Sequence, residues 1–119
     1  MDYQAAYILL HSQGREYQNT PESFLSRLQQ GKPPIPGQVT NILVALKMVF
    51  EDLRAEGVES IDRQVATSIY LVAFESRRAF IFGLRAGVVW PPLLDEDIDR
   101  IGLAVKSILA GTWYENSEQ

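Results

Sequence analysis

The stretch that decides the fold runs from Asp62 to Gly87 and reads DRQVATSIYLVAFESRRAFIFGLRAG. It contains no proline, and its apolar residues recur at helical spacing, so we expect one helix of about seven turns. One face carries Val65, Ile69, Val72, Ala73, Ser76, Phe80 and Leu84. The opposite face carries Leu71, Phe74, Ile81 and Phe82. Because a helix that is apolar on two faces needs cover on two sides, this stretch predicts a central helix around which other elements pack.

The flanking sequence predicts four further helices, over residues 2–13, 20–30, 38–56 and 95–110. In the second of these, Thr20 is placed as the N-cap and Pro21 as the first helical residue. Gly31, Gly57 and Gly111 follow the ends of three of them, as expected of C-terminal stops. The connector at 88–94, VVWPPLL, is apolar, which predicts that it folds back against the body of the protein.

These elements define an all-α fold. No stretch alternates convincingly between apolar and polar residues, so we expect a single-domain bundle of about five helices covering residues 1–119. The composition, 46% hydrophobic and 22% charged, is that of a globular domain. The polar tail at 115–119 is expected to be disordered.

Composition excludes several kinds of chemistry. The chain has no cysteine and one histidine, His11, so thiolate sites and paired imidazoles are excluded. The net charge of −4 argues against nucleic acid as a partner, and no apolar run is long enough to span a bilayer. We expect no membrane association, a cytoplasmic location and no cofactor. The acids at 95–99 are interpreted as favourable charges at a helix N-terminus and not as a metal site.

The middle of the central helix carries the most informative charges. Glu75 and Arg78 are three residues apart and can pair, while Arg78 and Arg85 project from the same side among aromatic residues. One interpretation is an anion-binding pocket formed by Glu75, Arg78, Arg85 and Trp90. The other is structural: the arginines, including Arg77, pair with acids of another helix or of a partner subunit, and Trp90 plugs the end of the bundle.

Two segments carry a family resemblance. PPIPGQVTNILVALKMVFEDL at 33–53 and YLVAFESRRAFIFGLRAGVVWPPLLDEDIDRI at 70–101 resemble a group of short helical cyanobacterial proteins of unassigned function. Some members are labelled as dethiobiotin synthetases. That enzyme class resembles P-loop users of ATP, and this chain has neither the loop nor the parallel-sheet pattern. The resemblance implies only a bacterial cytosolic setting.

No catalytic constellation is recognisable, so we expect a non-enzymatic interaction or regulatory module with a protein partner not named by any motif. The apolar side of the central helix that the other helices leave open predicts a homodimer. Antiparallel packing of two central helices would bring Glu75 of one copy near Arg78 of the other. The expected interface comprises Leu71, Phe74, Arg78, Ile81 and Phe82. The alternative to the dimer is that the proline-rich connector and the Trp90 loop cover that side within one chain. The alternative function is a small anion-binding protein or enzyme that uses the arginine-lined pocket.

Overall fold

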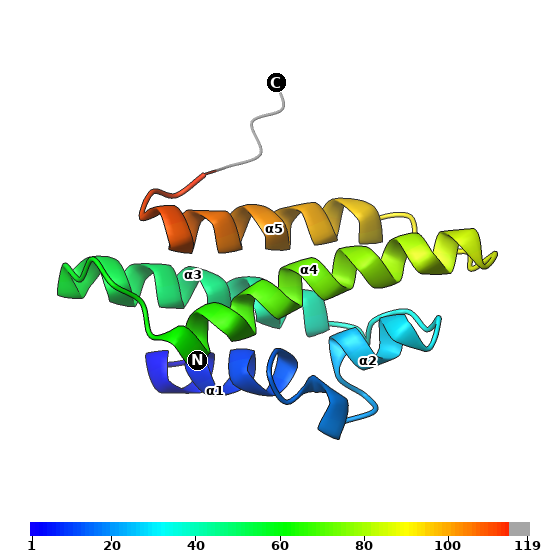
Figure 1. Cartoon of the computed structure of the whole chain (residues 1–119), viewed down its shortest axis with the longest axis horizontal. Coiled ribbons are helices and arrows are strands. Elements are labelled where there is room, and N and C mark those ends of the chain that lie inside the picture. Colours follow the sequence, from blue (N-terminus) through cyan, green and yellow to red (C-terminus); the bar gives the residue numbers. More distant parts are fainter. Residues whose placement is uncertain (115–119) are drawn as a thin grey trace.

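The computed structural model describes residues 1–114, and all of its regular elements are helices (Figure 1). They are α1 (Tyr3–Gln13), the short 3₁₀ helix η1 (Tyr17–Asn19), α2 (Phe24–Gln29), α3 (Gln38–Glu56), α4 (Arg63–Arg85) and α5 (Leu94–Ala110). Residues 1–114 contain no strand, which confirms the all-α prediction. The tail predicted at 115–119 lies outside the described residues.

Helix α4 is the central element, as the sequence predicts. It packs against α1, α2 and α5, and α1 and α5 also pack against α3. In Figure 1, α5 lies above α4, α1 and α2 lie below it, and α3 passes behind it. The side of α4 that faces away from α3 therefore has no helix in front of it.

The core is built from one apolar stripe of each helix. Leu10 of α1, Phe24 of α2, Leu46 of α3, Ile69 of α4 and Ile101 of α5 are all almost completely buried. Each stripe follows the 3,4 spacing that places side chains on one face of a helix. Burying a large apolar side chain of this kind contributes about 1.5–3 kcal/mol to the free energy of unfolding, so these stripes fix how the helices meet.

The helix ends agree with the sequence except at α2. The Asp62 carboxylate accepts hydrogen bonds from the backbone nitrogens of Gln64 (2.8 Å) and Val65 (3.3 Å), so Asp62 is the N-cap of α4. The prediction that Thr20 caps the second helix was wrong, because that helix begins at Phe24 and its N-cap is Ser23. The Ser23 hydroxyl accepts from the Ser26 nitrogen and also donates to the Tyr17 carbonyl, which ties the cap to η1.

A polar contact links α1 to α3. The Tyr7 hydroxyl donates a hydrogen bond of 2.9 Å to the Asp52 carboxylate. Burial, followed by the hydrogen bond and the negative charge of Asp52, raises the pKa of Tyr7 well above its ordinary value. The phenol is therefore held as a neutral donor.

Candidate functional site

Helix α4 has one buried face and one exposed face. The buried face comprises Ser68, Ile69, Val72, Ser76, Ala79 and Phe80. On the opposite face Tyr70 is 50% exposed, Phe74 42%, Ile81 37% and Phe82 52%. These four residues, with the half-buried Leu71, form what we call the outer face of α4. The second apolar side that the sequence predicts is thus present, and within residues 1–114 it remains exposed to solvent.

Neither connector expected to cover this face does so. Trp90 is 8% exposed and packs on the inner side of α4, where its ring stacks on Phe80 at a centroid distance of 6.0 Å. Its neighbour Val89 points outward and is 93% exposed. Leu84, predicted to be on the buried face, is also exposed, because the last turns of α4 project beyond α5 (Figure 1).

An aromatic row runs along the outer face at a spacing of four residues. Tyr70 and Phe74 stack with ring centroids 5.2 Å apart. The guanidinium of Arg78 follows, 5.7 Å from the Phe74 ring and 5.3 Å from the Phe82 ring. An arginine placed over ring faces is held by cation–π attraction. The outer face is therefore an ordered row with one positive charge at its centre.

The pair between Glu75 and Arg78, predicted from their spacing, is present but long. The Arg78 nitrogen lies 3.4 Å from both Glu75 carboxylate oxygens, whereas strong pairs of this type lie near 2.8 Å. The Arg78 side chain is about half exposed and that of Glu75 is mostly buried. A pair with this exposure contributes little, so Arg78 remains able to bind another acidic group.

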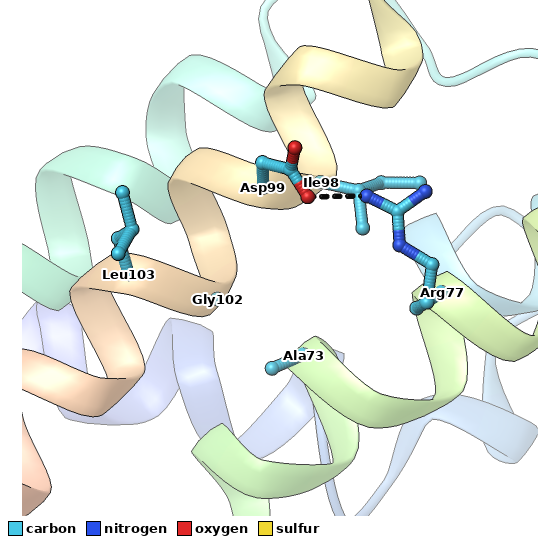
Figure 2. Close-up of a pocket in the computed structure, with 6 residues that line it drawn as sticks. All are labelled: Ala73, Arg77, Ile98, Asp99, Gly102 and Leu103. Atoms are coloured by element: carbon cyan, nitrogen blue, oxygen red, sulfur yellow. Dashed lines mark hydrogen bonds and ion pairs between the residues drawn. The ribbon is translucent and has the colours of Figure 1, made fainter. Parts of the chain in front are cut away.

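Arg77 has a different environment, and the structural interpretation of the charge cluster holds for it. Its guanidinium lies 2.7 Å from the Asp95 carboxylate and 2.6 Å from that of Asp99, both on α5. Figure 2 shows the contact with Asp99 at one end of a groove between α4 and α5. The charge of Arg77 is therefore balanced within the chain.

That groove was not anticipated from the sequence. Its volume is about 470 Å³, and it is lined by Ala73, Arg77, Ile98, Asp99, Gly102 and Leu103 (Figure 2). The available signal was the spacing of Asp95 and Asp99, which places both carboxylates on one side of α5. The groove adjoins the outer face of α4 and widens the surface that a partner could contact.

The structure pairs two of the four residues of the expected anion pocket with each other and engages a third inside the bundle. Arg85 is exposed in the last turn of α4, and Arg78 pairs with Glu75. Trp90 is buried, and its indole nitrogen donates to the Phe80 carbonyl at 3.0 Å. Arg78, Arg85 and Trp90 line neither the groove nor two further cavities, one beside Phe50 and one beside His11.

No helix within 1–114 has the length and apolar content needed to cross a bilayer. In the same part of the chain, no group of three or more acidic or histidine side chains is arranged to hold a metal ion.

Comparison with known proteins adds no relative: no family model, no curated protein and no solved structure matches the chain.

Proposed function

We propose that this protein is a non-enzymatic interaction module that self-associates through the outer face of α4. The observation that carries the proposal is the ordered aromatic row Tyr70–Phe74–Arg78–Phe82, which lies half exposed on the longest helix. Scattered apolar residues are normal on a protein surface, but a contiguous row is typical of an interface.

The size of the row supports this reading. The three aromatic side chains have about 200 Å² each, and at roughly half exposure they offer about 300 Å² of accessible surface. Ile81, 37% exposed, extends the patch. Apolar atoms make up only about 60% of a typical protein interface, so a polar rim adds to the area of an apolar patch. With such a rim, this patch corresponds to one side of an interface near the lower end of the standard size range.

The composition of the row also fits a protein partner. Tyrosine, phenylalanine and arginine are enriched at interfaces and supply most of the energetically important contacts. Arg78 belongs to that set because its flat guanidinium can stack on a ring and bind a carboxylate at once. Anion binding by Glu75, Arg78, Arg85 and Trp90 has less support, because the Trp90 ring and its nitrogen are both engaged inside the bundle.

Sedimentation equilibrium at micromolar concentration tests the proposal. We expect a mass of twice 13.4 kDa for the wild-type chain and the monomer mass for Phe74→Glu. The matched control is Val44→Glu, because Val44 on α3 is 43% exposed and Phe74 42%. Circular dichroism checks that both variants fold.

Two results would overturn self-association through this face. One is a wild-type chain that stays monomeric over the whole concentration range, and the other is dissociation by Val44→Glu as complete as by Phe74→Glu. A thermal-shift series with inorganic phosphate and succinate tests the alternative. An anion that raises the melting temperature of the wild type, but not of Arg78→Ala, would favour anion binding.

A further inference from the structure

The outward residues of α4 have the spacing of a coiled-coil seam. Thr67, Leu71, Phe74, Arg78, Ile81 and Arg85 follow one another at intervals of 4, 3, 4, 3 and 4 residues. All are exposed except Leu71, which is half-buried. Intervals of this kind keep one narrow stripe facing a second helix along its whole length. The outer face therefore has the residue spacing that suits packing along a second helix.

The seam is also symmetric in position about Ser76. Reversing the helix about this residue exchanges Leu71 with Ile81 and Phe74 with Arg78. The same reversal exchanges Thr67 with Arg85. A two-fold interface requires the same patch on both copies, so that residue i meets residue j and j meets i. Any seam with alternating intervals maps onto itself in this way, so what favours the register is the side chains that it brings together.

We infer that the partner of α4 is the α4 helix of a second copy, antiparallel to it and in the register centred on Ser76. The inference rests on the proposed function and adds its geometry. In this register Leu71 packs beside Ile81 of the second copy, and Ile81 beside Leu71 of the second copy. Apolar residues thus meet apolar residues on both sides of the centre.

The central layer pairs Phe74 with Arg78 of the second copy. Arg78 already lies 5.7 Å from the Phe74 ring within its own chain, so a second aromatic face extends a contact that is present. Glu75 of the second copy comes close to Arg78 from the side. Its carboxylate, only loosely engaged at 3.4 Å in its own chain, gives each arginine an acid across the interface.

Charge selects the antiparallel orientation over the parallel one. A parallel pair in register would place Arg78 against Arg78 and Arg85 against Arg85, so like charges would meet in two layers. The antiparallel register separates them and sets Arg85 against the uncharged Thr67. Arg77, on the edge of the seam, adds no unbalanced charge because Asp95 and Asp99 of its own chain hold it.

The absence of cysteine from the sequence makes a disulfide test direct. Leu71→Cys and Ile81→Cys are prepared separately, mixed under reducing conditions to allow exchange, and oxidised. A disulfide requires the two Cα atoms to lie within about 7 Å. In the inferred register, position 71 of one copy faces position 81 of the other, whereas two residues at position 71 lie about 15 Å apart along the helix axis.

We expect a cross-linked dimer on a non-reducing gel from the mixture, and monomer from each variant alone. Thr40→Cys, exposed on α3, replaces Leu71→Cys as the control and should give no cross-link with Ile81→Cys. Labelling with a maleimide before oxidation verifies that every thiol is reactive.

The cross-linking and sedimentation results distinguish the antiparallel register from self-association itself. Cross-linking of either variant with itself, to the same extent as in the mixture, would overturn the antiparallel register. The register would also be overturned if sedimentation shows a dimer and the thiols are reactive, but none of the samples forms a disulfide. In both cases self-association itself stands. A monomeric wild-type chain would overturn the proposed function together with the register.

Discussion

The indole nitrogen of Trp90 donates a hydrogen bond of 3.0 Å to the backbone carbonyl of Phe80, which brings the indole flat against α4. The approach is possible because residue 83 is glycine: a Cβ atom at this position would overlap Cζ2 of the Trp90 ring. The apolar connector predicted to fold against the bundle does so through Trp90, together with Val88 and Leu94, which also pack against the core.

Gly83→Ala should therefore destabilise the protein. The added methyl group displaces the Trp90 ring from a packed site, which costs about 1–3 kcal/mol and outweighs the gain of about 1 kcal/mol in helix propensity. Gly102→Ala is the matched control, because a Cβ at this position in α5 meets nothing within 4 Å. It should stabilise by about 0.5–1 kcal/mol. Urea unfolding at one protein concentration measures both, and an equal gain from the two variants would contradict the role given to Trp90.

Arg77→Met should weaken the contact between α4 and α5. The variant removes an arginine held by two carboxylates, but because these are about two-thirds exposed the expected loss is only about 1 kcal/mol. Arg100→Met is the control, since Arg100 pairs with Asp97 inside one helix. Its expected cost is smaller, about 0.3–0.5 kcal/mol. The difference between the variants should shrink as salt is added, and a difference unaffected by salt would contradict an ionic origin.

The helices themselves could be read from the sequence with little error. The limits predicted for α3 match the structure, and the predicted start of the central stretch, Asp62, is the N-cap of α4. Both depend on local chemistry: apolar spacing along one helix, and a side chain that bonds the nitrogens two and three residues ahead. The start of α2 was misplaced because two residues suited to capping, Thr20 and Ser23, compete there. Ser23 is used because its hydroxyl also reaches the Tyr17 carbonyl, a contact that depends on the turn before it.

The sequence was sufficient to predict which residues share the exposed face of α4, but not which of the charged residues pair with one another. That Phe74, Ile81 and Phe82 share one side follows from helical periodicity alone. Which of the two neighbouring arginines would be engaged does not, because it depends on how α5 is rotated against α4. That rotation brings Asp95 and Asp99 to Arg77 and leaves Arg78 outside.

Tyr7 should make the stability of the protein fall at high pH. Its pKa in the folded state lies above the value of about 10 expected in the unfolded chain, so the neutral phenol stabilises the fold fully below pH 10. As the pH rises beyond this value, the unfolded state loses its proton first and stability declines. Tyr7→Phe should cost about 1 kcal/mol near neutral pH, through loss of the hydrogen bond to Asp52, and should lack this part of the decline.

Urea unfolding measured from neutral pH to above pH 10 would follow this effect. Asp52→Asn is the second variant, because it keeps an acceptor oxygen for the phenol but removes the negative charge that raises the Tyr7 pKa. Its decline should be smaller than that of the wild type. Parallel curves for the wild type and Tyr7→Phe would contradict the effect of burial and Asp52 on Tyr7.

Arg78→Leu tests what the central arginine does in the proposed dimer. A polar residue at one seam position fixes register at a cost in affinity, because the charge must be partly desolvated on association. Leucine removes that cost, so we expect the dimer to tighten on the order of tenfold, equivalent to about 1.4 kcal/mol. It also removes the repulsion that disfavours the parallel pair. Leu71→Cys in the Arg78→Leu background should then cross-link with itself, whereas we expect no such cross-link in the wild-type background. Weaker association of Arg78→Leu in sedimentation would show instead that the arginine contributes net binding energy through Glu75 and Phe74 of the second copy.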